Sequence, residues 1–412
     1  MKKILALALA CVLVLGLFAG CGAKSDSAKV VYWSMWESTE PQGKAIAESV
    51  KAFTEKTGIQ VDLQFKGRSG IRDGLLPALT ANQVIDVFDE DIDRVNNDFK
   101  DYLLDLEELN KKYDYEKTAV AGLMDACRVA GNGTLKTIPY QPNVFAFFYN
   151  QKIFDEAGIT AAPTTWDELL DACAKIKAVG YIPITCDDAY ITCMIGYHLG
   201  RLVGEEGVRD IVNNNKWDDP AVAQFAADYA ELASLGYFSP NVASNAWPAG
   251  QNTELAGGKV GMYLNGSWLP NEVKDTAGPD FQWGCFSYPA VDGGVNGPET
   301  CNYGAQVYAI NKNSKVSDEA FQLIQFLTKG EADKKLSEYS VGIPADTTNT
   351  EWPALLSGVK PVMDSVSVRW SWAVGVESNV DITPAIKENT LKLCGGSITA
   401  DEFIQNMKNA AG

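Results

Sequence analysis

The sequence contains a single histidine, His198, and none of its nine cysteines forms a C-x-x-C pair. Metal sites and proton relays that use several histidines or paired cysteines are therefore excluded. Basic residues are also scarce, because 35 Lys and Arg stand against 53 Asp and Glu, which gives a formal net charge of −18. A protein that binds the phosphate backbone needs a basic face, so the composition argues against nucleic acid as a partner.

The common motifs of nucleotide, metal and cofactor binding are missing as well. Residues 257–259 (GGK) have neither the upstream glycine nor the Ser or Thr of a P-loop. An EF-hand loop starting at Asp89 would need Gly and Glu where the chain has Arg94 and Lys100. No G-x-S-x-G, no H-E-x-x-H and no G-x-G-x-x-G after a strand is present. We expect no cofactor, no metal site and no catalytic residue.

Only one long apolar run exists, residues 4–20, and it follows two lysines at the start of the chain. It is short for a membrane span and ends in small residues, which is typical of a secretory signal. The sequence LFAGC, ending at Cys21, resembles a bacterial lipoprotein box with Phe18 where Leu is usual. That resemblance implies a signal peptide over 1–20, a lipidated Cys21 and a tether over 21–29. An ordinary secretory signal with an incidental cysteine is the alternative.

Removal of Cys11 with the signal and lipidation of Cys21 would leave seven cysteines, an odd number. Exported proteins usually pair their cysteines, so an odd and scattered set indicates buried thiols instead. These cysteines are Cys127, Cys173, Cys186, Cys193, Cys285, Cys301 and Cys394.

Hydrophobic patterning along the rest of the chain alternates strands with helices. A strand at 30–36, a helix at 43–57 and a strand at 59–65 predict a βαβ unit and a partly parallel sheet. The other expected elements are helices at 71–83, 165–179, 317–329, 381–394 and 399–410, and strands at 84–88, 143–149, 181–185 and 303–310. The fold class is α/β, and 412 residues are too many for one compact core, so we expect two lobes.

Three segments in order, 139–170, 257–268 and 308–344, resemble the carbohydrate-type extracellular solute-binding proteins (family 1) of bacterial ABC importers. This resemblance implies a two-lobed type II periplasmic-binding-protein fold with hinge-linked lobes and a central cleft. It also implies a monomer, held on the extracellular face of the cytoplasmic membrane by its lipid anchor, that delivers a carbohydrate to the transmembrane permease subunits. The implied lobes are 30–141 with 302–345 (N-terminal) and 142–301 with 346–412 (C-terminal), with crossings near 140–144, 300–304 and 344–347.

A sugar presents hydroxyl groups at its rim and C–H groups on its faces, so its site needs carboxylates or amides together with flat rings. A stacked ring contributes about 0.5–1.5 kcal/mol and a hydrogen bond to a charged group about 1.5–3. A few of each reach the roughly 8 kcal/mol of a micromolar dissociation constant. Ten tryptophans and sixteen tyrosines supply rings for such a site.

In the N-terminal lobe, candidates follow two strands at their carboxyl ends, where ligands of open α/β sheets bind. Trp36 and Glu37 follow the first strand, and alternation makes Trp33 the core residue. Residues 89–93 (DEDID) follow strand 84–88 and, by charge alone, could be a solvated acidic turn. The family resemblance assigns ligand contacts within this turn to Glu90, Asp91 and Asp93.

In the C-terminal lobe, Asp188 and Tyr190 follow strand 181–185, and Trp247 has Pro and Gly neighbours that predict a loop. Trp268 ends GSW, where the family places a stacking ring. The remaining candidates lie at the implied crossings or in RWSWAVG (369–375), and they are Tyr140, Asn143, Tyr303, Trp370 and Trp372.

Two other classes of function stay open from the residues alone. A surface glycoside hydrolase or lyase could use the acidic pairs Glu90/Asp91 or Asp187/Asp188. A binder of a peptide, a polyamine or an organic anion could use the acidic residues, or Arg68 and Arg369.

Overall fold

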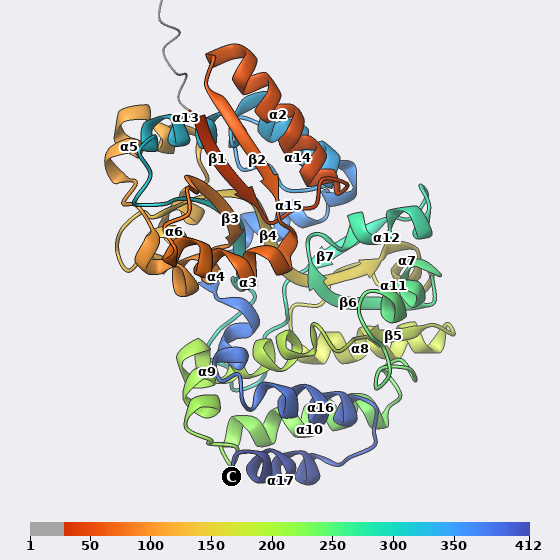
Figure 1. The fold of residues 1–412 in the computed structure, drawn as a ribbon. Coiled ribbons are helices and arrows are strands. Elements are labelled where there is room, and N and C mark those ends of the chain that lie inside the picture. The colour runs from red at the N-terminus through yellow and green to blue at the C-terminus, as the bar shows by residue number, and fades with distance from the viewer. Residues whose placement is uncertain (1–28) are drawn as a thin grey trace, which may run out of the picture.

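The computed structural model describes residues 29–412 as two bodies, which we call the N-lobe and the C-lobe (Figure 1). The predicted signal peptide and Cys21 lie outside the described residues. The strands of the N-lobe are β1 (Lys29–Ser34), β2 (Gln60–Phe65) and β3 (Val87–Asp91). Its helices are α2 (Pro41–Thr57), α3 (Gly67–Thr80), α4 (Ile92–Asp98), α5 (Glu107–Tyr113), α6 (Ala121–Ala130), α13 (Ser317–Leu327) and α14 (Gly330–Ser340), with 3-10 turns η1 (Lys100–Tyr102) and η2 (Tyr115–Thr118).

The C-lobe lies below the N-lobe in Figure 1 and contains the C-terminal end of the chain. Its strands are β5 (Ile182–Thr185), β6 (Val260–Gly266), β7 (Trp283–Phe286) and β9 (Val368–Trp370). Its helices are α7 (Gln151–Glu156), α8 (Trp166–Ala178), α9 (Ile191–Asn213), α10 (Pro220–Ser234), α11 (Ala249–Ala256), α12 (Leu269–Ala277), α15 (Val359–Ser365), α16 (Thr383–Cys394) and α17 (Ala400–Ala410), with 3-10 turns η3 (Ala354–Leu356) and η4 (Trp372–Ser378).

The predicted βαβ unit is confirmed, because β1 pairs in parallel with β2 on one side and with β3 on the other. Helix α2 connects β1 to β2, with Pro41 in its first turn and Gly58 in the left-handed conformation just past its end. Its buried face includes Ile46, Val50 and Phe53, the three residues that its sequence pattern places on one side. The predicted α/β fold class is therefore observed.

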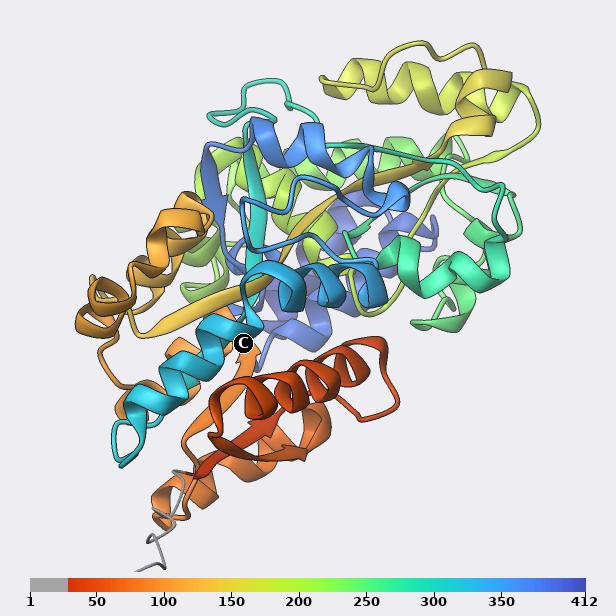
Figure 2. The ribbon, with the colours of Figure 1, turned by 90° about the horizontal axis from the view of Figure 1, so that it is seen from above.

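Two long antiparallel strands, β4 (Thr137–Asn150) and β8 (Thr300–Ile310), connect the lobes. The first half of β4 pairs with β8, and its second half pairs with β6 and β7 of the C-lobe. Figure 2 shows β4, in yellow, running obliquely through the middle of the molecule. The register of β4 against β8 shifts between Tyr140 and Pro142, where Gln141 has a φ of 45°. The chain thus bends at the point where it passes between the lobes.

Each lobe has its own hydrophobic core. The N-lobe core includes Tyr32, Phe53 and Phe88, and the C-lobe core includes Phe147 and Trp217. Val341 and Ile343 pack into the C-lobe core, although the implied boundary places 302–345 in the N-terminal lobe.

The strand predicted at 84–88 is shifted, because the observed strand β3 starts and ends three residues later. Val84 is 69% exposed, and β3 begins at Val87 and continues through the acidic residues to Asp91. The neighbouring strands set this boundary, since β8 pairs with β3 along residues 87–91 and β1 pairs with residues 87 and 88. Asp89 and Glu90 consequently belong to the sheet and not to a turn that follows it.

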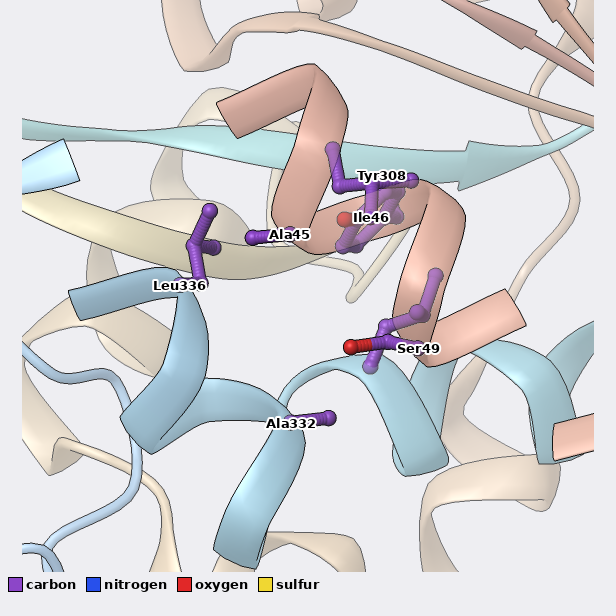
Figure 3. A pocket seen from close by; sticks show the side chains of 7 residues that line it. Ala45, Ile46, Ser49, Tyr308, Ala332 and Leu336 are labelled. Atoms are coloured by element: carbon purple, nitrogen blue, oxygen red, sulfur yellow. The ribbon is translucent and has the colours of Figure 1, made fainter. Parts of the chain in front are cut away.

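All seven cysteines of residues 29–412 are free thiols, and all but the half-buried Cys285 are buried, as expected from their number and spacing. Within the same residues, no helix combines the length and the apolar character that a bilayer crossing requires. A narrow gap between α2 and α14, shown in Figure 3, is lined by Ala45, Ile46 and Leu336 and has no room for a water-sized molecule. It is a packing seam and not a ligand site.

Candidate functional site

Five aromatic rings from separate parts of the C-lobe and β4 form a group that we call the aromatic cluster: Phe145, Tyr190, Trp247, Trp268 and Trp372. The centre of the Phe145 ring lies 5.6 Å from that of Tyr190, 6.0 Å from that of Trp268 and 5.7 Å from that of Trp372. Tyr190 lies 6.2 Å from Trp247. Phe145 is buried at the base, whereas the other four rings are partly or well exposed. Such a surface can stack on the faces of sugar rings.

Local sequence explains the position of Trp268. It lies just after β6 and immediately before α12, where Pro270 in the first turn favours the start of the helix. The ring folds back over Gly266, because a Cβ atom at that glycine would lie only 2.2 Å from the indole. Glycine in GSW therefore makes room for the ring against the end of the strand.

The turn after β5 holds Tyr190 and Trp247 through two aspartates. Buried Asp187 accepts hydrogen bonds from the backbone N–H groups of Ala189 (2.7 Å) and Tyr190 (3.0 Å), and from the hydroxyl of Tyr263. Exposed Asp188 accepts one from the backbone N–H of Trp247 at 2.9 Å. Asp188 thus lies beside the aromatic cluster, with one oxygen occupied by this loop.

A cavity of about 390 Å³ lies between α4 of the N-lobe and the segment around η4 of the C-lobe. Trp372 lines this cavity and also contacts Phe145, so the cavity and the aromatic cluster share one ring. The cavity is lined mainly by polar and charged side chains: Asp91, Asp93, Arg94, Asn97, Asp98, Arg209, Ser371, Glu377 and Ser378, together with Trp372 and Gly375. Rings and hydrogen-bonding groups therefore lie side by side.

Asp93 connects the two sides of this cavity. Its two oxygens accept hydrogen bonds from Nη2 of Arg369 at 2.9 and 3.0 Å, and one oxygen lies 3.4 Å from the backbone N–H of Trp372. Arg369 also donates from Nε to the carbonyl of Tyr303 on β8 at 2.7 Å. Asp93 and Arg369 are both partly exposed, and Asp93 lines the cavity.

Asp91 and Glu90 differ in their access to the cavity. Asp91 is the N-cap of α4 and accepts from the N–H groups of Asp93 (2.9 Å) and Arg94 (3.3 Å). Burial, followed by the charge of Asp93, raises the pKa of Asp91 to about 6. Glu90 is fully buried within β3 and forms a two-pronged ion pair with Arg72 at 3.2 and 3.3 Å. Its predicted position on a loop is wrong, because β3 extends past it.

Trp36 and Tyr140 are buried in the N-lobe core. The Trp36 indole N–H donates to the Tyr140 hydroxyl at 2.8 Å, and that hydroxyl donates to Asp89. Tyr140 stacks on Tyr308 with 4.2 Å between ring centres, and Trp36 is only 5% exposed. The guanidinium of Arg68 lies over the Trp36 ring, 4.7 Å from its centre.

The other predicted residues also differ in exposure. Glu37 is exposed on the loop after β1, and Asn143 is half-buried on β4 opposite Gly304 of β8. Tyr303 is 8% exposed, in a small apolar cluster with Leu123. Trp370 is buried, with the guanidinium of Arg201 4.8 Å from its ring centre. The two tryptophans of RWSWAVG thus diverge, one into the core and Trp372 into the site.

Sequence reasoning missed several residues of this site. Phe145 looks like any core position of an apolar strand, and its contact with three candidate rings depends on the fold. Glu377 accepts from the Trp372 indole N–H at 3.0 Å and from the Thr192 hydroxyl at 2.6 Å. Arg209 and Ser371 are joined at 2.8 Å along the cavity wall. No local motif marks these residues, because partners such as Thr192 for Glu377 and Ser371 for Arg209 are far away in the sequence.

Three comparisons relate this chain to known proteins. A protein of Brucella abortus with the general name of binding protein is 28% identical over 225 residues, 52% of each chain. The multiple sugar-binding protein of Streptococcus mutans is 27% identical over 216 residues, 50% of each chain. The matches thus span about half the length of these curated relatives. A solved structure of a chitin oligosaccharide binding protein aligns over 94% of this chain and all of its own, with 21% identity and a TM-score of 0.72.

The structural likeness covers both lobes and confirms the two-lobed type II periplasmic-binding-protein fold with its central cleft. The family described as bacterial extracellular solute-binding protein matches residues 36–334, which is most of the chain and includes β2, β3, both connecting strands and most of the site. The protein belongs to the bacterial extracellular solute-binding protein family.

Proposed function

We propose that this protein is a non-catalytic receptor that captures a sugar or oligosaccharide between its lobes and delivers it to the permease of an ABC importer. The observation that carries the proposal is the aromatic cluster beside a polar cavity, joined through Trp372. Ring faces suit the C–H faces of a sugar, and carboxylates, guanidinium groups and hydroxyls suit its rim. The names of relatives that bind multiple sugars and chitin oligosaccharides support the same ligand class.

The acidic pairs that an enzyme would need have structural roles. Glu90 is paired with Arg72 inside the sheet, and Asp91 caps α4. Asp187 accepts two backbone hydrogen bonds and one from Tyr263. A glycosidase needs two carboxyl groups that face one bond from opposite sides, and these adjacent, engaged pairs do not offer that arrangement. This supports binding without turnover.

The location of the protein follows from the same proposal. Lipidation of Cys21 would hold a monomer on the extracellular face of the cytoplasmic membrane, where two or more acyl chains give stable anchoring. The segment 21–29 would be its tether. The lobes would comprise 30–141 with 302–345 and 142–301 with 346–412, and they would close over the ligand. Closure adds contacts from the second lobe, so a ligand that contacts both lobes favours the closed form.

Titration calorimetry of residues 22–412 with a panel of uncharged oligosaccharides tests the proposal. We expect saturable binding with at least one glycan and no product after long incubation. The matched variants Trp268→Ala and Trp352→Ala each remove an indole, and only Trp268 belongs to the aromatic cluster. We expect Trp268→Ala to weaken binding about 30-fold, as at a stacked hot spot, and Trp352→Ala to leave it unchanged. A broad panel without a single binder, or formation of product, would refute the proposal.

A further inference from the structure

The turn η4 has an unusual backbone at the residues just after Trp372. Ala373, Val374 and Gly375 have φ values of 49°, 52° and 81°, so three consecutive residues adopt the left-handed conformation. Only glycine adopts it freely, and a β-branched residue such as Val374 is especially disfavoured there. A non-glycine residue persists in this conformation only where the surrounding structure imposes it.

The surrounding structure is helix α9, which carries two glycines one turn apart. A Cβ atom at Gly196 would lie 2.2 Å from the carbonyl oxygen of Ala373, and one at Gly200 would lie 2.8 Å from Cγ1 of Val374. Side-chain atoms never approach so closely, so only glycine at these two positions allows the turn to lie against the helix. Gly196 and Gly200 thus form a shallow groove for the left-handed turn.

Both ends of the turn are also fixed to α9 by hydrogen bonds. Before it, the backbone N–H of Ser371 donates to Glu205 at 3.0 Å. After it, Glu377 accepts from the Trp372 indole at 3.0 Å and from Thr192 at 2.6 Å. Glu205 and Thr192 both belong to α9. The Trp372 ring therefore takes its position from this helix on either side of the turn.

We propose that Gly196 and Gly200 are positioning residues that set the ligand-contacting ring of Trp372 by letting the left-handed turn pack against α9. The part that concerns ligand contact rests on the proposed function. A ring that is held in place before the ligand arrives loses little conformational entropy on binding, which favours affinity. The sequence G-x-x-x-G in α9 thus determines the position of a ring in the cleft, although neither glycine lines the cavity.

The test uses Gly200→Ala, with Gly207→Ala as its matched control. Both variants add one methyl group to α9, but the group at Gly207 meets the Val203 side chain of the same helix instead of the turn. The first readout needs no ligand: the ¹⁹F resonance of Trp372 in 5-fluorotryptophan-labelled protein, assigned by its loss in Trp372→Phe. We expect Gly200→Ala to shift this resonance and to weaken glycan binding about tenfold, and Gly207→Ala to do neither.

A rescue variant separates positioning from general destabilisation. In Gly200→Ala/Val374→Ala the new methyl group no longer meets Cγ1 of residue 374 and keeps only its contacts with the Trp370 ring at 3.0 and 3.2 Å, so the Trp372 resonance and the affinity should return part of the way to wild type. If Gly200→Ala does not fold, Gly375→Ala disturbs the same turn from the Arg209 side and should shift the same resonance. A folded variant with lower stability but an unchanged Trp372 resonance would overturn the inference. Because this readout needs no ligand, it stands even if no glycan binds and the proposed function fails.

Discussion

The carboxyl ends of β3 and β5 are built alike and yet present different chemistry. In each lobe a buried aspartate lies close to the strand end: Asp89 is within β3, before its last two residues, and Asp187 comes just after β5. Each accepts a tyrosine hydroxyl, from Tyr140 and Tyr263 respectively, and each accepts at least one backbone N–H. The shared arrangement fixes the strand end, so what the lobe offers to a ligand depends on the residues that come next.

The residues that follow each aspartate give the two lobes different chemical surfaces. After Asp89 the acidic chain continues in the sheet, and Asp91 starts α4, so the N-lobe presents carboxylates around a helix start. After Asp187 a short turn presents the rings of Tyr190 and, through Asp188, Trp247. The N-lobe thus contributes hydrogen-bonding groups and the C-lobe contributes ring faces. A sugar has both kinds of surface, so neither lobe alone matches it.

The largest expected effect is a difference in stability between a variant of a buried tryptophan, Trp36, and a variant of a partly exposed one, Trp268. Trp36→Ala removes a buried indole from the N-lobe core and should lower the free energy of unfolding by about 3–5 kcal/mol. Trp268→Ala, at a partly exposed ring, should lower it far less. Urea denaturation of both variants measures the difference. Equal losses of stability, or a Trp36→Ala protein that keeps its stability and loses only glycan affinity, would break the comparison between the lobes.

The second expected effect concerns pH and Asp89. Burial raises the pKa of Asp89 to about 7, whereas an aspartate in the unfolded chain titrates near 3.8. Between these values the folded protein keeps a proton that the unfolded chain has released, so this group makes the protein less stable as pH rises from about 4 to about 7. The variant Asp89→Asn has no carboxyl group at this position, so it lacks this contribution to the pH dependence of stability.

The wild type should therefore gain stability relative to Asp89→Asn, by a few kcal/mol, as pH falls from 7.5 to 5. Urea midpoints of both proteins at the two pH values measure this change. Other buried carboxyl groups, such as Asp333 with a pKa near 6, act in the same direction but cancel in the difference. A constant difference between the two proteins would show that Asp89 does not titrate in this range.

The third expected effect tests whether the two strand ends are alike. Tyr140→Phe leaves Asp89 and the indole N–H of Trp36 without the hydroxyl, and Tyr263→Phe leaves Asp187 without it. Each loss should lower the free energy of unfolding by about 1–3 kcal/mol, with the larger value for Tyr140 because two partners lose a bond. Thermal or urea unfolding measures both. If Tyr263→Phe leaves the free energy of unfolding unchanged, the C-lobe turn is held by its backbone hydrogen bonds alone.

The candidate site was predictable where the relevant signal was local. Tyr190 follows a predicted strand and Trp247 lies beside Pro and Gly, whereas Trp268 and Trp372 were named from the family resemblance; the fold brings these four rings into one cluster with Phe145. Whether they contact a ligand remains a prediction. These rings come together because the strand ends and loops of one lobe meet at the same edge of its sheet.

The N-lobe was less predictable because tertiary contacts decide its details. Alternation along β1 assigned Trp33 to the core and Trp36 to the surface, but β1 ends at Ser34 and both rings are buried. Apolar Val84 and Ile85 suggested an earlier strand, whereas pairing with β1 and β8 sets β3 over Val87–Asp91. Such choices depend on neighbours that a single sequence does not reveal.

The smallest expected effect concerns the outer edge of the aromatic cluster. Trp247 is 44% exposed, contacts Tyr190 edge-on, and has one long hydrogen bond, from its indole N–H to Glu272 at 3.4 Å. Trp247→Phe keeps a ring but shortens the surface, so affinity for a long oligosaccharide should fall only about two- to fivefold. Affinity for a disaccharide held on Trp268 and Trp372 should not change. Calorimetry with a ladder of chain lengths measures both values, and an equal loss at every length would place Trp247 at the centre of the cluster instead of its edge.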